Sequence, residues 1–302
     1  MNNNFFYQTL PTYAIIFLMI GAATVFNNRE IILPEVSALS IGCLIYQNPT
    51  WLAKPFHVFL LPSLTAVGGF FTNRLDINLA AKLILVLIMV VAVLSMFKSG
   101  MAPAFATGLL PVITRADSMM FIYSIVLLTL LLYIVIRLSN NHLPTPQQAK
   151  QQGHRHRLLY LAFVSVWVVI CWVMGWMLMA AIPPVIVVGY ESMHKDAYPI
   201  GILGKQVLCL VAGALIGTVS LYLCKNLLLT TLVDMALVTM LIKIVQFKLT
   251  PTYAMSLLPM VLPGTSHTYF GLCVLLLCVV VLGFVWVYKN ARVISNFLPG
   301  RS

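Results

Sequence analysis

The chain alternates between twelve apolar runs and short connections that hold most of its charged residues. The runs lie near residues 5–26, 32–47, 57–73, 78–97, 102–114 and 120–138, and near 158–181, 182–193, 199–224, 227–247, 249–263 and 269–288. A helix needs about 20 apolar residues to cross a bilayer, and several runs reach that length. The pattern predicts an all-α, polytopic helical membrane protein with six segments in each half.

One polar stretch separates the two halves. It runs from residue 139 to 157, contains two prolines and several glutamines, and ends in the basic run His154-Arg155-His156-Arg157. Such composition is typical of a linker. The sequence therefore predicts a first membrane repeat at 1–138, a cytoplasmic polar linker at 139–157 and a second membrane repeat at 158–302. The two histidines are interpreted as part of a solvated basic face.

A proline-bearing element occurs once in each half. Residues 101–111 read MAPAFATGLLP and residues 249–259 read LTPTYAMSLLP. The prolines Pro103 and Pro111 fall on Pro251 and Pro259, and an earlier pair, Pro34 and Pro183, keeps the same order. Interrupted hydrophobic segments at matching places in two halves are the sequence signature of a transporter's binding site. The match predicts two six-segment repeats with short, proline-broken helices.

Composition excludes a soluble globule. Apolar residues make up 61% of the chain and charged residues 8%, so we expect a chain that lies within the lipid bilayer. The net charge of +11 is spread singly over short connections rather than gathered in a patch. This distribution argues against a nucleic-acid partner and is typical of topology signals.

The positions of the basic residues predict the orientation of the chain. If all twelve runs cross and the N-terminus is inside, the outer loops hold only Arg29, Arg74, Arg115 and Lys225. The inner loops then hold Lys54, Lys98, Arg137, Lys150, Arg155, Arg157, Lys195, Lys248, Lys289, Arg292 and Arg301. Short cytoplasmic loops collect Lys and Arg, so we expect a cell-membrane protein with both termini in the cytoplasm. An even number of crossings per half predicts parallel repeats.

Signatures of catalysis and of metal binding are not found in the sequence. It has no HExxH, GxSxG or P-loop motif, and its six cysteines lie in apolar runs without a CxxC pair. We therefore expect neither an enzyme nor a bound cofactor or metal, and the cysteines are interpreted as core residues.

The repeated pattern x-Pro-x-x-Ala-x-x-Leu-Leu-Pro resembles the HPP family of integral membrane proteins, named for a His-Pro-Pro tripeptide. At the tripeptide positions this chain reads Ala102-Pro103-Ala104 and Thr250-Pro251-Thr252, so only the central proline is retained. The resemblance covers roughly the last four segments of each half. It implies a role in membrane transport, with small anions as the cargo.

The two proline elements are the predicted substrate site. A proline within a membrane helix frees a carbonyl, and small neighbours let backbones approach a ligand. The candidate binding residues are Pro103, Ala104, Thr107, Pro251, Thr252 and Tyr253. The alternative is that Pro103 and Pro251 only kink helices that pack tightly where the repeats meet.

Ionisable residues inside membrane segments are costly and are functional candidates by default. Asp234 is the deepest acid and is a candidate for coupling to a proton or cation. Its expected partners are Lys205 and the more distant Lys243, and Glu35, beside Pro34 at a segment start, is a further coupling candidate. The alternative for Asp234 is an interfacial acid near the outer surface.

Together these features predict a secondary transporter or facilitator of a small solute, with its site between the two repeats. The other candidate is a non-catalytic membrane subunit or scaffold. A polar cavity at the midplane favours transport, whereas a dry interface favours the scaffold. The expected partners are a small-molecule solute and the lipid bilayer, and formation of a homo-oligomer is left open by the sequence.

Overall fold

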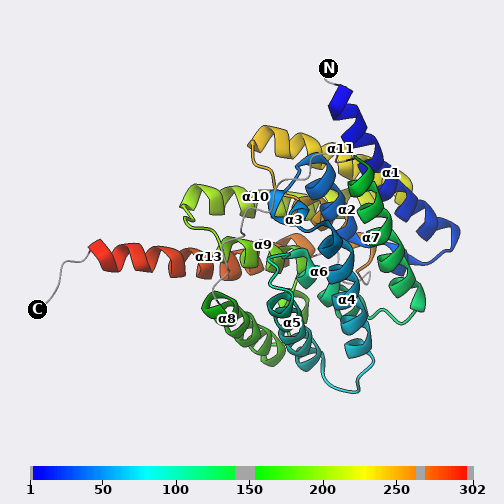
Figure 1. Cartoon of the computed structure of the whole chain (residues 1–302). Helices are drawn as coiled ribbons and strands as arrows, with labels where there is room; N and C mark the ends of the chain where they lie inside the picture. Colours follow the sequence, from blue (N-terminus) through cyan, green and yellow to red (C-terminus); the bar gives the residue numbers. More distant parts are fainter. Residues whose placement is uncertain (1–2, 140–153, 263–268, 298–302) are drawn as a thin grey trace, which may run out of the picture.

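A computed structural model describes residues 3–139, 154–262 and 269–297, and the described chain is helical throughout (Figure 1). Eight helices are long and apolar enough to cross a membrane. They are α1 (Asn3–Val25), α4 (Pro55–Asn73), α5 (Leu79–Met96), α7 (Met119–Ser139), α8 (His154–Val173), α10 (Ile200–Cys224), α11 (Leu227–Val245) and α13 (Phe270–Phe297). The expectation of a helical, multi-pass membrane protein is confirmed at this level.

Four shorter helical segments lie among the long ones. They are α2 (Pro34–Ser40), continued by the π-helical turn η2 (Ile41–Ile45), α6 (Pro103–Thr114), α9 (Pro183–Met193), and α12 (Pro251–Leu257), continued by η4 (Leu258–Met260). Each of the four begins with a proline. Proline suits the first helical position because its φ is preset and the missing N–H has no intrahelical acceptor there. Minor elements are η1 (Arg29–Ile31), α3 (Pro49–Leu52) and η3 (Met177–Met179).

The short helices form the centre of the molecule, and Figure 1 shows α2, α6 and α9 in the middle of the bundle. All seven residues of α2 and all seven of α12 are buried. Across the two halves, α2 packs against α12 and α6 packs against α9. The long helices present apolar side chains outward, for example Leu127, Leu223 and Ile244, as a lipid-facing surface requires.

The two halves show the same order of elements: long, short, long, long, short, long. The spacing from Leu79 to Leu227, the starts of α5 and α11, equals the spacing from Pro103 to Pro251. An asparagine caps each of these long helices, with Asn78 accepting from an amide of α5 and Asn226 from two amides of α11. Contacts between the halves are reciprocal, because α1 packs against α11 and α8 against α5.

Two glycines let a long helix touch the backbone of a short one. A Cβ on Gly69 of α4 would lie 2.0 Å from the carbonyl oxygen of Gly108 in α6. A Cβ on Gly217 of α10 would lie 1.9 Å from the carbonyl oxygen of Ser256 in α12. Such separations are far below van der Waals contact, so only glycine fits. The same type of contact, a glycine against a backbone carbonyl, therefore fixes the positions of both α6 and α12.

Two boundaries differ from the sequence expectation. The apolar run 158–181 is not one helix: α8 ends at Val173, Gly175 adopts φ +73°, and η3 follows. A left-handed glycine is a common helix terminator. Helix α8 also begins at His154, inside the stretch assigned to the linker. Residues 140–153 of that linker lie outside the described residues.

The glycine contacts predict a sharp difference between two substitutions on α10. Gly217→Ala should lower the free energy of unfolding by about 1–3 kcal/mol, because the added methyl group overpacks the contact with Ser256. Gly204→Ala is the matched control, since nothing lies within 4 Å of its Cβ position, and it should raise stability by about 0.4–1 kcal/mol because alanine favours the helix. Unfolding of the purified protein in detergent measures both. Equal stabilities would contradict the packing described here.

Candidate functional site

The predicted substrate residues lie at the starts of two different short helices, and those helices have different neighbours. Pro103, Ala104 and Thr107 are on α6 and are buried, where the helix packs against α4, α5 and α9. Thr107 Oγ1 lies 2.8 Å from Thr65 Oγ1 and donates to the carbonyl oxygen of Ala104 at 3.2 Å. The hydrogen-bonding capacity of the Thr107 hydroxyl is therefore used within the fold.

The second element is different. Pro251, Thr252 and Tyr253 begin α12, are all buried, and lie where α12 packs against α2, α10 and α11. The methyl group of Thr252 faces Gly213 of α10, and its hydroxyl has no hydrogen-bond partner among the described residues. Unlike Thr107, Thr252 presents an unused polar group in the interior.

Tyr253 belongs to a chain of four hydroxyl groups that joins both halves. Tyr13 OH of α1 lies 3.3 Å from Thr239 Oγ1 of α11, and that oxygen lies 3.2 Å from Tyr253 OH. Tyr253 OH is 3.5 Å from Tyr46 OH, directly after η2. The ammonium of Lys248 lies 5.5 Å from the centre of the Tyr46 ring. The four hydroxyl groups and Lys248 therefore place hydrogen-bond donors and a positive charge beside the start of α12.

Sequence reasoning missed Tyr13, Tyr46 and Thr239. Their contacts join positions more than two hundred residues apart, as between Tyr13 and Thr239 or Tyr46 and Tyr253. The available signal was a general one: a tyrosine within an apolar segment needs a partner for its hydroxyl. That rule identifies candidates but does not pair them.

Along α2, two buried side chains also have polar atoms without partners in the described parts of the chain. Both carboxyl oxygens of Glu35, which is 2% exposed, are in this state, and so is the hydroxyl of Ser40, which is 0% exposed. Together with Thr252 they place three unsatisfied polar side chains on α2 and α12, two short helices from different halves that pack together. Buried polar groups are normally hydrogen-bonded, so these exceptions mark a candidate site.

Asp234 lies on α11 and is fully buried. The hydroxyl of Ser220 on α10 donates to its Oδ1, while its Oδ2 has no partner among the described residues. Ser220 follows Gly217 by one turn, so the carboxyl group lies beside the place where α10 touches the backbone of α12. Asp234 is thus enclosed by protein, and its role as a coupling acid stays a prediction.

The expected lysine partners of Asp234 are not beside it. Lys205 is exposed on α10 and precedes Ser220 by about four turns, roughly 22 Å along the helix axis. Lys243 is also exposed and lies roughly 13 Å further along α11. The pairing of Asp234 with Lys205 is therefore wrong, because Asp234 faces the other end of α10. Glu35 lies on α2, whereas Lys205 and Lys243 lie on α10 and α11.

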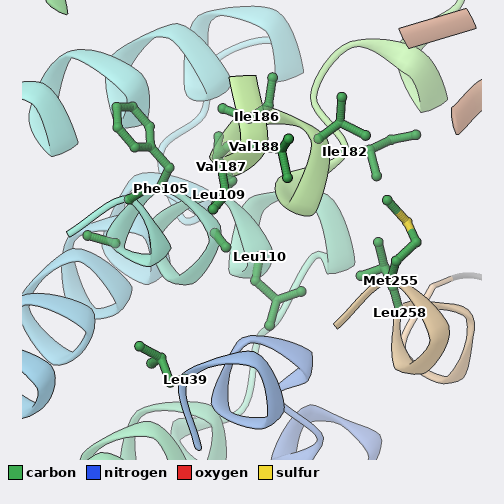
Figure 2. Close-up of a cluster of buried hydrophobic side chains, with 14 of the residues drawn as sticks. Leu39, Phe105, Leu109, Leu110, Ile182, Ile186, Val187, Val188, Met255 and Leu258 are labelled. Atoms are coloured by element: carbon green, nitrogen blue, oxygen red, sulfur yellow. The ribbon is translucent and has the colours of Figure 1, made fainter. Parts of the chain in front are cut away.

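The centre of the interface between the halves is apolar. Figure 2 shows side chains from all four short helices gathered there, among them Leu39 of α2, Leu110 of α6, Val187 of α9 and Met255 of α12. Each of these is at most 3% exposed. The unsatisfied polar groups of α2 and α12 thus border a close-packed apolar centre. Within the described ranges, no three His, Cys, Asp or Glu side chains gather as a metal site would require.

No family model, no curated protein and no solved structure matches this chain, so the resemblance to the HPP family stays an expectation from the residues alone.

Proposed function

We propose that this chain is a secondary transporter or facilitator of a small solute, and that the solute passes along the contact between α2 and α12. The observation that carries the proposal is the set of unsatisfied polar side chains, Glu35, Ser40 and Thr252, on these two helices. Leaving a buried polar group without a partner costs about 1–3 kcal/mol, and more for a charged group. A solute or proton that visits these groups in another conformation accounts for that cost.

The hydroxyl chain around Tyr253 extends this route. Helix α2 carries Glu35 in its first turn and is followed, through η2, by Tyr46, whose hydroxyl meets that of Tyr253. Polar groups therefore occur along α2 and again directly after η2, with the carboxyl group of Glu35 at one end and the hydroxyl chain at the other. The apolar centre beside this line closes the route in the described conformation. Such a barrier suits a carrier that opens to one side at a time.

The two halves are proposed to be parallel repeats related by a pseudo-twofold axis along the membrane normal. The common order of elements, the paired asparagine caps and the reciprocal contacts of α1 with α11 and α8 with α5 support this arrangement. Six segments in each half, four long and two short, give an even number of crossings, which leaves both halves the same way up. Alternating access then follows from rocking of one half against the other.

Asp234 is the proposed coupling residue, with Glu35 as the second. Asp234 is buried, and its free carboxyl oxygen can take a proton or a small cation. Because Lys205 is exposed, we leave it out of the coupling site. The HPP resemblance points to a small anion as the cargo.

A non-catalytic membrane subunit is the second candidate function. The apolar centre in Figure 2 is the observation that favours it, because a permanently closed interface needs no route. Comparing uptake in cells with and without the gene first selects a panel of small anions and organic acids. Purified protein in liposomes is then tested with this panel. A transporter carries at least one of these solutes, whereas a non-catalytic subunit carries none.

Both termini are proposed to face the cytoplasm. Reporter fusions should place Ser302 inside, and a fusion after Arg115 in the connection that follows α6 should report outside. The physical reason is the excess of basic residues in the connections assigned to the inside. An outside signal from Ser302 would overturn both the orientation and the parallel repeats.

The two threonines of the proline elements give a matched test of the route. Thr252→Val removes a hydroxyl that makes no hydrogen bond to the described residues, so uptake into liposomes should fall by about tenfold or more while stability is unchanged or slightly raised. Thr107→Val removes the bond to Thr65, so it should lower stability by about 1 kcal/mol and leave uptake per folded molecule unchanged. The reverse pattern would exclude the route along α12.

Asp234→Asn should abolish accumulation driven by an imposed ion or pH gradient, because the amide cannot exchange a charge. Ser220 can still donate to the amide oxygen, so protein abundance should be preserved. Glu191→Gln is the control and should retain gradient-driven uptake. Uptake that follows the gradient equally in both variants would remove Asp234 from the coupling mechanism.

A further inference from the structure

The basic run at residues 154–157 is not simply a solvated linker face. It forms the first turn of α8, and Arg157 is only 5% exposed. Its guanidinium donates to Ser95 Oγ and to the carbonyl oxygen of Ser99, both at 3.2 Å. Arg157 thus holds the end of α5 and the connection to α6, and it carries a positive charge into a nearly closed environment.

Basic groups from two further elements meet this turn. The ring of His156 lies 6.4 Å from the ring of His194, just after α9, and its Nδ1 is 3.4 Å from Tyr288 OH of α13. Beside Tyr288, the ammonium of Lys289 donates to the carbonyl oxygen of Lys195 at 2.7 Å. Helix α9 packs against both α8 and α13, which brings these groups to one end of the bundle (Figure 1).

His194 lies among these charges in a defined protonation state. Its Nδ1 is 2.7 Å from the carbonyl oxygen of Tyr190, and only an N–H can make that bond, so Nδ1 carries the proton. Its Nε2 is buried and has no partner among the described residues. Burial, together with the charges of Arg157, His156 and Lys289, lowers the pKa of His194 to about 4. At neutral pH the ring is uncharged, and Nε2 is an unused acceptor.

We propose that this cluster, defined as His156, Arg157, His194, Tyr288 and Lys289, binds an oxyanion, and that His194 takes up a proton from solvent when the anion binds. A bound anion accepts hydrogen bonds from the basic side chains. Its negative charge also offsets the positive electrostatic potential that these side chains create at His194. The protonated Nε2 then donates to an anion oxygen, while Nδ1 keeps its bond to Tyr190. The site is distinct from the route along α2 and α12 and does not depend on transport.

The other titratable groups nearby do not supply that anion. Glu191 of α9 interacts with Lys195, so its charge is already opposed. Toward α6, the ring of Tyr190 meets the ring of Phe105 at 4.7 Å. Toward α10, Ser192 and Tyr198 hydrogen-bond the amide of Gln206. Asp196, two residues after His194, has an interaction of its own. The acids Glu191 and Asp196 are outnumbered by Arg157, Lys195 and Lys289, so the formal charge of these groups stays positive.

The sign of the pH dependence follows from the pKa of His194. In the free protein the ring gains a proton only near pH 4, whereas the bound anion raises that pKa. Affinity for the anion should therefore increase as pH falls through the raised pKa, and the increase should stop near pH 4. Each unit by which binding raises the pKa gives up to tenfold in affinity.

Sulfate is the probe, because it remains a dianion over the whole pH range. Calorimetric titration of the full chain, delipidated in a neutral detergent, should show sulfate binding about tenfold tighter at pH 5 than at pH 7.5. His194→Gln should still bind sulfate but lose this ratio. Lys289→Gln should weaken binding at both pH values and keep the ratio. His57→Gln, in the other half, is the control and should match the unsubstituted protein.

A second measurement does not rely on variants that fold poorly. Carbon-13 signals of histidine in the unsubstituted protein should show one ring that titrates near pH 4, with its pKa raised by about two units in saturating sulfate, the rise that a tenfold affinity ratio between pH 5 and pH 7.5 requires. Absence of sulfate binding by folded protein, or an unchanged titration of that ring, would overturn the proposal.

An oxyanion at this end of the bundle has two sources, a soluble ion or the phosphate of an anionic lipid. Nanodiscs distinguish them. If lipid occupies the site, phosphatidylglycerol should weaken sulfate binding relative to phosphatidylcholine alone, whereas a site reserved for soluble ions should bind sulfate equally in both.

Discussion

The structure depends on how the ends of four short helices are accommodated where water is scarce. The first amides of any helix lack intrahelical acceptors, and inside a membrane protein few other acceptors are available. Each short helix begins with proline, which removes one such donor, and no side chain caps its start. Enclosing these ends among eight long helices keeps them from lipid. The central position of α2, α6, α9 and α12 follows from this requirement.

The same enclosure explains the contrast between the apolar centre and its polar borders. Side chains that meet at the middle of the four helices, such as Leu110 and Met255, contribute only packing. Glu35 and Thr252 lie on the same helices yet keep unsatisfied polar atoms. Packing alone would replace such groups with apolar ones of similar size at little cost. Their presence is the feature that a purely structural account leaves unexplained.

Much of the helical pattern could be predicted from hydrophobic periodicity, because apolar runs bounded by proline and charge coincide with helices. The loop after α8 could not, since Met177 and Met179 continue the apolar pattern although Gly175 had already ended the helix. At the candidate site, the burial of Asp234 could be predicted from its apolar surroundings in the sequence. Its partner Ser220 could not, because that contact depends on which faces of α10 and α11 meet. The exposure of Lys205 was hidden for the same reason.

The contact between Gly217 and the backbone of Ser256 restricts how α10 and α12 can move. Side chains between two helices act as a compressible spacer, but here backbone meets backbone and no spacer exists. Sliding α10 toward its own N-terminus would drive the larger residues Ser220 and Leu221 into that carbonyl. Turning about the contact point avoids the collision. Helix α10 therefore pivots at Gly217, and a small change in its tilt produces a larger displacement at the end of the helix that is further from this contact.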